Sequence, residues 1–150
     1  MNNEIGIKLV VMESAEGLNL PHYASEGAAG MDIEAAINDP ITLKPQERKA
    51  IPTGLMMAIP SGYEVQIRPR SGLAFKQGLT VANAPGTIDS DYRGEVKVIL
   101  INLGEEDVTI TRGMRIAQMI VAPVTRGEFI LSDTLEDTDR GSGGFGSTGL

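Results

Sequence analysis

Short runs of aliphatic and β-branched residues recur along this chain, and clusters of Pro, Gly, Asn and Asp separate them at intervals of roughly 8–12 residues. Proline occurs within each of the segments that could otherwise show the 3.6-residue period of an amphipathic helix, so the pattern predicts strands there. The strands expected from it are Ile7–Met12, Met31–Ala36, Ile41–Leu43, Arg48–Pro52, Leu55–Pro60, Glu64–Arg68, Leu79–Ala82, Glu95–Leu103, Val108–Thr111, Arg115–Val124 and Glu128–Leu131. This rhythm is typical of an all-β protein built as an antiparallel sandwich or barrel.

One helix is expected, over Ser71–Gln77, with Ser71 as its N-cap and Gly78 as its C-terminal stop. Arg70 directly precedes it. Free N–H groups and the positive end of the helix dipole would, together with this arginine, form a site for an anion. A capped surface helix that binds nothing fits the same residues equally well.

The two strands Leu79–Ala82 and Glu95–Leu103 predict a β-hairpin with a wide, irregular tip. The tip gathers Asn83, Asp89 and Tyr92. Turn chemistry explains about half of this composition. It does not explain an aromatic hydroxyl beside carboxylates, and connecting segments often carry functional side chains. A carboxylate such as Asp89 at the mouth of a hairpin can orient and deprotonate a water molecule, and the Asn83 amide carries both a donor and an acceptor.

Composition and charge narrow the possible functions. A chain of 150 residues is expected to form one domain, which we place at 1–139, before a glycine-rich tail at 140–150. There is no Cys and a single His, which argues against disulfides and His-based metal sites and fits a reducing, cytoplasmic location. A net charge of −7 disfavours polymeric nucleic acid. Neither a signal peptide nor an apolar membrane segment is evident.

The tail RGSGGFGSTG is too rich in glycine to pack a core, and we expect it to be mobile without a ligand. An unstructured terminus is the simplest interpretation. However, glycine-rich backbone beside Arg140 can wrap a phosphate, and the lone Phe145 can stack on a base. No GK[ST] follows the glycines, so the tail is not a P-loop.

Five stretches in this order, AGMDIEA, RPRSGLAFKQG, GTIDSDYRGE, GMRIAQM and RGSGGFGSTG, resemble the five signature motifs of the trimeric dUTP pyrophosphatases, or dUTPases. They span residues 29–149. The resemblance implies a jelly-roll-like β domain that assembles as a homotrimer with active sites shared between chains. It also implies hydrolysis of dUTP to dUMP and pyrophosphate, which supplies dUMP for thymidylate synthesis and keeps uracil out of DNA.

The resemblance also assigns roles to individual residues. Those expected to contact the triphosphate are Arg70, Ser71, Gly72, Gln118, Arg140, Gly146 and Ser147, and Asp32 is expected to act on Mg²⁺ through water. Those expected around the nucleoside are Asn83, Thr87, Ile88, Asp89, Tyr92, Lys97 and Phe145. Without the resemblance, the simpler interpretation of Asp32 is a strand-edge carboxylate that faces water, and that of Gln118 is a hydrogen-bonded core or edge amide.

Two other functions are compatible with the same fold. A dCTP deaminase shares the architecture, but the deaminases of the family are generally longer and lack a tail like the one at 140–149. A β trimer that binds nucleotides without catalysis is the second alternative, and the presence of Asp89, Tyr92 and Phe145 together argues against it.

Overall fold

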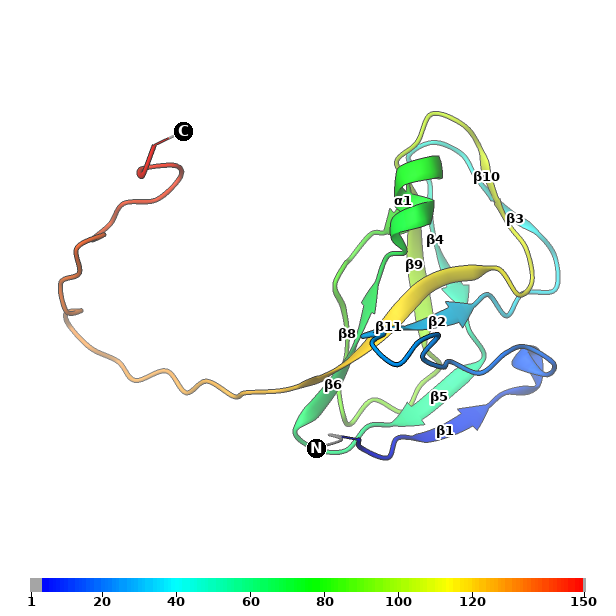
Figure 1. Cartoon of the computed structure of the whole chain (residues 1–150), viewed down its shortest axis with the longest axis horizontal. Coiled ribbons are helices and arrows are strands. Elements are labelled where there is room, and N and C mark those ends of the chain that lie inside the picture. The colour runs from blue at the N-terminus through cyan, green and yellow to red at the C-terminus, as the bar shows by residue number, and fades with distance from the viewer. Residues whose placement is uncertain (1–3, 150) are drawn as a thin grey trace.

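The computed structural model describes residues 4–149, which form a β body with one short helix (Figure 1). Its elements are β1 (Lys8–Val11), the 3₁₀ turn η1 (Glu13–Ala15), β2 (Met31–Glu34), β3 (Ile41–Leu43), β4 (Arg48–Pro52), β5 (Leu55–Ala58), β6 (Tyr63–Arg68), α1 (Ser71–Gln77), β7 (Leu79–Val81), β8 (Gly86–Ile88), β9 (Lys97–Asn102), β10 (Val108–Ile110) and β11 (Arg115–Pro123). Ten of the expected strands are present with small shifts at their ends, so the prediction of an all-β class is confirmed.

Every strand pairing in the described part of the chain is antiparallel. The sheets have the orders β2-β11-β6-β8, β4-β9-β7, β1-β5 and β10-β3, and none of them closes into a barrel over residues 4–149. Side chains alternate across the sheets. In β9, for example, Val98, Leu100 and Asn102 are buried while the residues between them are not. This period of two is typical of a sheet with one face on the core.

The core lies between the sheets and consists almost entirely of aliphatic side chains. Two polar side chains, Thr53 and Asn102, are also buried. Asn102 has an exposed fraction of 0%. Its side-chain nitrogen donates to the carbonyl oxygens of Leu43 (2.9 Å) and Glu106 (2.7 Å), and its side-chain oxygen accepts from the Gly104 N–H (2.8 Å). A buried amide with all these partners fixes the loop after β9 against β3.

The predicted hairpin forms, since β7 pairs with β9 from Leu79↔Asn102 to Val81↔Leu100. Its tip is more ordered than the sequence indicated. It contains a strand that we did not predict, β8, which pairs with β6 in a different sheet, Val65 facing Ile88. The chain between β7 and β9 therefore crosses from one sheet to the other. Asp89 directly follows β8 of one sheet, in the loop that returns to β9 of the other sheet.

The predicted helix is present, but its N-terminal cap was assigned wrongly. Arg70 occupies the cap position with extended backbone, Ser71 is the first helical residue, and no side chain makes a capping hydrogen bond. The hydroxyl of Ser71 is thus not used by the helix itself. The C-terminal stop is confirmed: Gly78 is left-handed (φ 67°), and a Cβ there would lie 2.4 Å from the Gly104 nitrogen.

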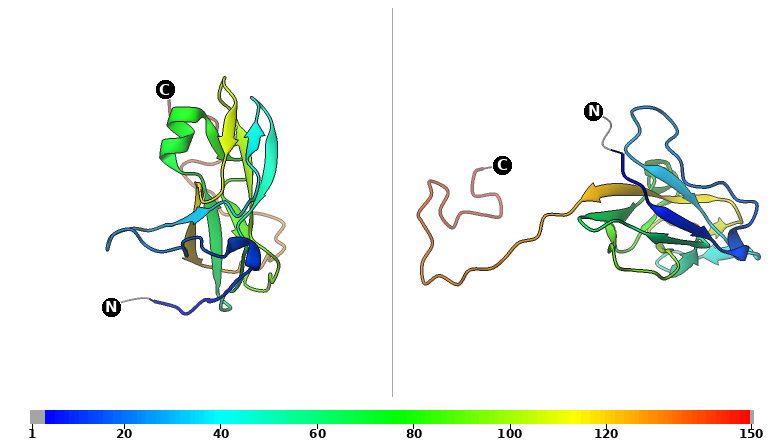
Figure 2. Two further views of the ribbon diagram at one scale, coloured as in Figure 1. Left: turned by 90° about the vertical axis from the view of Figure 1, so that its right-hand side faces the viewer. Right: turned by 90° about the horizontal axis from the view of Figure 1, so that it is seen from below.

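After β11 the chain leaves the body and runs outward as an extended arm (Figures 1 and 2). The predicted strand Glu128–Leu131 was wrong for this single chain, because no strand of the body pairs with it. Phe129, Ile130 and Leu131 are almost completely exposed. Over residues 4–149, no helix combines the length and the apolar character that crossing a membrane requires.

Candidate active site

Asp32 lies at the centre of the first group of predicted site residues. It belongs to β2, directly opposite Gln118 of β11. Arg70 donates from Nε to Oδ1 of Asp32 (3.2 Å), and Arg115 donates from NH1 to Oδ2 (3.3 Å). Arg70 also donates to the Arg115 carbonyl oxygen (3.2 Å). We call Asp32, Arg70, Arg115 and Gln118 the phosphate cluster.

The ion pairs of this cluster are partly open to water, with exposed side-chain fractions of 32% for Asp32, 26% for Arg70 and 59% for Arg115. Ion pairs with this exposure contribute about 0–1 kcal/mol each to stability. Replacing one partner by a ligand oxygen therefore costs little. The cluster is suited to exchanging partners when an anion binds.

Gln118 is held in place by backbone on both sides. Its Nε2 donates one hydrogen to the Pro69 carbonyl oxygen (3.0 Å). A Cβ on Gly30 would lie 2.4 Å from the Gln118 side-chain oxygen, so only glycine leaves room for this amide. An amide nitrogen carries two hydrogens, and the second remains able to donate to a ligand. The Gln118 amide thus donates one hydrogen to the backbone and keeps the second available.

Ser71 and Gly72 stand next to this cluster at the start of α1, and both are exposed. A Cβ added to Gly72 would meet no atom of the chain within 4 Å. The fold itself therefore does not require a glycine at this position.

The second group surrounds a pocket of about 300 Å³ on the hairpin, which we call the hairpin pocket. Its lining consists of Ala50, Thr87, Ile88, Asp89, Tyr92, Glu95, Val96, Lys97 and Ile99. Asp89 and Thr87 are exposed while Ile88 is buried and anchors them. Asp89 also borders a larger hollow of about 610 Å³ on its other side. Its carboxylate accepts no hydrogen bond from the described residues and is open to a ligand or water.

Tyr92 is fixed within the hairpin pocket. Its hydroxyl donates to the Glu95 carbonyl oxygen (2.9 Å), and a Cβ on Gly94 would lie 2.4 Å from that hydroxyl. The residue is 47% exposed, so part of its surface remains available to a ligand. Lys97 approaches Glu95 at 3.9 Å, a loose surface pair.

Asn83 does not line the hairpin pocket in this single chain. It lies in the turn before β8, with its amide close to Gly86, where a Cβ would lie 3.2 Å from the amide nitrogen. The next residues, Ala84 and Pro85, border a shallow hollow together with Arg68, Pro69 and Gln118. The turn thus lies between the hairpin pocket and the phosphate cluster.

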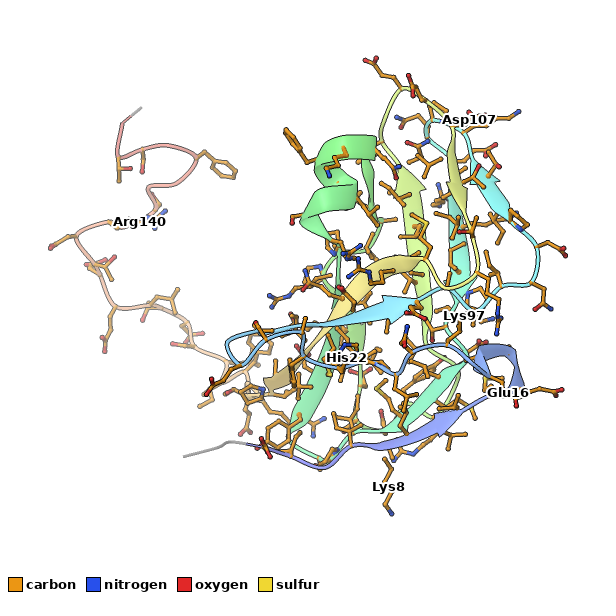
Figure 3. The ribbon with its side chains drawn as sticks, turned by 45° about the vertical axis from the view of Figure 1, so that its right-hand side comes forward. Lys8, Glu16, His22, Lys97, Asp107 and Arg140 are labelled. Atoms are coloured by element: carbon orange, nitrogen blue, oxygen red, sulfur yellow. The ribbon has the colours of Figure 1, made fainter. Side chains whose placement is uncertain are left out.

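The tail residues stand apart from both groups. Figure 3 shows Arg140 on the extended arm, far from Lys97 on the body. Arg140 makes only a local contact, donating to the Gly143 carbonyl oxygen (2.8 Å). Phe145 is fully exposed, and Gly146 and Ser147 belong to local turns. The structure of one chain does not bring these residues to the phosphate cluster or the hairpin pocket.

The site reasoning from sequence missed Arg115. A signal was available, because this residue is the only charged side chain of the otherwise apolar strand RIAQMIVAP. It also lies inside the GMRIAQM stretch.

The fold and these groups define a class: an all-β protein with a guanidinium-and-amide cluster suited to phosphate oxygens and a separate pocket that combines a carboxylate with an aromatic ring. The family model for dUTPase matches residues 16–149. The deoxyuridine 5'-triphosphate nucleotidohydrolase of Roseobacter denitrificans is 60% identical over 147 residues, which cover 97% of each chain. This chain belongs to the dUTPase family.

Solved structures agree with this assignment. The dUTPase of Staphylococcus bacteriophage 80alpha, determined with dUPNHPP, is 25% identical and has a TM-score of 0.85, over 97% of this chain and 99% of that one. A variant of the dUTPase of phage phi11 of S. aureus, which coordinates a structural Mg(II) ion, is 22% identical. Its TM-score is 0.77 over 89% of this chain and all of that one, so it supports the fold.

Proposed function

We propose that this protein hydrolyses dUTP to dUMP and pyrophosphate in the cytoplasm, as a homotrimer whose active sites are shared between chains. The observation that carries the proposal is that the site residues fall into two separate groups within one chain. Within a chain of the dUTPase family, the groups suited to the triphosphate and those suited to the nucleoside form two separate clusters. The product dUMP would feed thymidylate synthesis, and removal of dUTP would keep uracil out of DNA.

In this proposal the phosphate cluster holds the triphosphate. Arg70 releases Asp32 and pairs with a phosphate oxygen, for which a guanidinium is well matched. Gln118 donates its second N–H hydrogen, and the uncapped Ser71 hydroxyl donates as well. These contacts position the α-phosphorus and offset the charge that develops on the oxygens around it.

Asp89 acts as the general base. Its open carboxylate takes a proton from a water molecule, whose oxygen forms a bond to the α-phosphorus. The bond from the α-phosphorus to the α–β bridging oxygen breaks, and the electron pair leaves with pyrophosphate. The proton on Asp89 is returned to solvent after the products leave.

The donor set fits Mg²⁺ bound mainly through the substrate. Among residues 4–149, no group of three or more His, Cys, Asp or Glu side chains could hold a metal ion, and Asp32 is a single carboxylate bordered by guanidinium groups. Mg²⁺ is commonly held by phosphate oxygens and waters with one or two carboxylates. When bound, it would neutralise phosphate charge and fix the conformation of the triphosphate. Asp32 would bind its waters.

Selectivity is assigned to the hairpin. The Asn83 amide and the backbone near Thr87, Ile88 and Lys97 would pair with the uracil edge, and their fixed donors and acceptors would leave cytosine unpaired. The Tyr92 ring, locked against Gly94, would lie along the deoxyribose and exclude a 2′-hydroxyl.

The extended arm that follows β11 is an argument for the proposed trimer. An extended segment with nearly fully exposed Phe129, Ile130, Leu131 and Leu135 is unfavourable in water, and a neighbouring copy of the chain would cover it. The same arm carries Arg140 away from its own body (Figure 3), and Phe145 is fully exposed. In the trimer these residues would close over the site of a neighbour, with Phe145 on the uracil and Arg140, Gly146 and Ser147 on the phosphates.

Three measurements test the proposal together. Pyrophosphate release should be much faster from dUTP than from dCTP or UTP. In ¹⁸O-labelled water the label should enter dUMP and not pyrophosphate, because the α-phosphorus is attacked. Sedimentation should give a trimer. Ammonia release from dCTP would instead indicate a deaminase, and binding of dUTP without turnover would indicate a non-catalytic protein.

A further inference from the structure

The pairing of β11 with β2 contains an irregularity that determines where Arg115 points. From Gln118↔Asp32 to Ala117↔Ile33 the register is regular, but Arg115 faces Glu34, so one residue is inserted at Ile116. In a regular strand, side chains alternate, and Arg115 would share the buried face of Ala117. The bulge reverses this: Ile116 is buried and Arg115 lies on the face of Asp32 and Gln118.

The carboxylate nearest to Arg115 in the register is not the one it contacts. Glu34 is occupied, because it accepts hydrogen bonds from the backbone nitrogen (3.0 Å) and side-chain nitrogen (2.7 Å) of Asn19. Arg115 instead reaches diagonally to Oδ2 of Asp32. Asp32 therefore has one guanidinium on each oxygen, Arg70 on Oδ1 and Arg115 on Oδ2.

We propose that Arg115 is a positioning residue: it keeps Asp32 directed toward the nucleotide and its Mg²⁺ after Arg70 has left Asp32 for a phosphate oxygen. This inference rests on the proposed function. Two guanidiniums on one carboxylate are redundant in the free protein. Arg115 becomes necessary when the substrate recruits Arg70. Without Arg115, Asp32 would then have no hydrogen bond from a side chain to hold its carboxylate in position.

Arg70 and Arg115 differ in exposure and in position, and these differences assign the phosphate contact to Arg70 and the positioning role to Arg115. Arg70 precedes α1 and is the less exposed, at 26%, next to Ser71 and Gln118, where the phosphates are proposed to lie. Arg115 is placed by the bulge in the same strand as Gln118, and among the described residues its side chain donates a hydrogen bond only to Asp32. A residue that orients a metal-binding carboxylate without touching the metal commonly affects metal affinity by about 10–100-fold.

The test measures binding of dUPNHPP by calorimetry, in Mg²⁺ and in EDTA, for the wild-type protein, Arg115→Gln and Arg115→Lys. Because the nucleotide is a non-hydrolysable analogue, the readout does not depend on activity. We expect Arg115→Gln to reduce the gain in affinity that Mg²⁺ provides by about tenfold and to leave binding in EDTA within about twofold. Arg115→Lys should restore part of the gain. Arg48→Gln, which removes an exposed arginine of β4, controls for the charge change and should behave like the wild type.

The outcomes separate this inference from the proposed function. Failure of the wild-type protein to bind dUPNHPP in Mg²⁺ would refute the proposed function. Normal wild-type binding with an unchanged Mg²⁺ gain in Arg115→Gln would refute only the positioning role. Equal losses in Mg²⁺ and EDTA would also refute it, since they would place Arg115 on the phosphates or in the scaffold. If Arg115→Gln does not fold, the same comparison is made with Arg115→Met, for which a Mg²⁺ gain equal to the wild type would overturn the proposal.

Discussion

Mixed trimers test most directly whether one active site is built from several chains. Two inactive proteins are needed: Asp89→Asn with an intact tail, and a chain lacking residues 140–150 with Asp89 intact. In one chain the arm carries Arg140 away from the pocket that Asp89 borders. If the tail serves a neighbour, a hybrid trimer can pair the good Asp89 of one chain with the good tail of another.

The magnitude follows from cyclic symmetry. In the proposed cyclic trimer each site would take its hairpin from one chain and its tail from a fixed neighbour, so every hybrid trimer would have one competent site, whichever protein supplies two of its chains. Random mixing in equal amounts makes about three-quarters of the trimers hybrid, and about a quarter of all sites competent. Activity per chain should therefore reach about a quarter of the wild-type value, from two parents that are each nearly inactive.

The assay is pyrophosphate release from dUTP after co-expression or joint refolding, with hybrid trimers confirmed by native mass spectrometry. Simple mixing of folded parents, without subunit exchange, is the control and should remain inactive. If the tail closes over its own chain's hairpin, no mixture can make a complete site. Background activity in a sample of proven hybrids would therefore refute the shared-site arrangement.

Four single substitutions test the individual roles. Asp89→Asn should leave dUPNHPP binding and the melting temperature largely intact and reduce kcat by about 10²–10⁴-fold; near-normal turnover would remove Asp89 from the mechanism. Tyr92→Ala should raise UTP turnover relative to dUTP, and an unaltered ratio would contradict the sugar-sieve role. Asn83→Ala should weaken dUPNHPP binding by about 1–3 kcal/mol and narrow the preference for uracil over cytosine, which nucleotide competition would measure. Gly72→Ala should leave the melting temperature unchanged or higher, since a helical Ala is favoured over Gly by up to about 1 kcal/mol and meets no atom here, yet it should raise KM for dUTP. An unchanged KM would mean that no phosphate approaches Gly72.

Local patterns predicted most of the fold because each strand carries its own signal. The run of aliphatic and β-branched residues in β9 and the turn residues between the strands depend only on nearby sequence. β8 was missed because its three residues lie among turn residues, and only pairing with β6 makes them a strand. The segment Glu128–Leu131 was predicted as a strand for the opposite reason: its residues favour a strand, but its own chain offers no partner edge.

For the site, the motifs supplied the residues but not their arrangement. Asp32, Arg70 and Gln118 are far apart in sequence, and no periodicity relates them. Their meeting depends on the pairing of β2 with β11 and on the position of α1. Arg115 could not be placed on this face from sequence, because regular alternation puts it on the buried face. A one-residue bulge, which has no clear sequence signature here, decides its direction.

Charge explains why such a divided site can work in an acidic protein. Arg68, Arg70 and Arg115 with Asp32 leave two formal positive charges near the proposed phosphate position, in a chain of net charge −7. A nucleoside triphosphate carries a charge of about −4 near neutral pH, so one chain alone cannot balance it. Mg²⁺ bound to the triphosphate would supply the other two positive charges, so the phosphate cluster and the metal together would offset the charge of the substrate. In the proposed trimer, Arg140 of a neighbour would add one further positive charge, which the bound phosphates attract and the free cluster, already positive, does not.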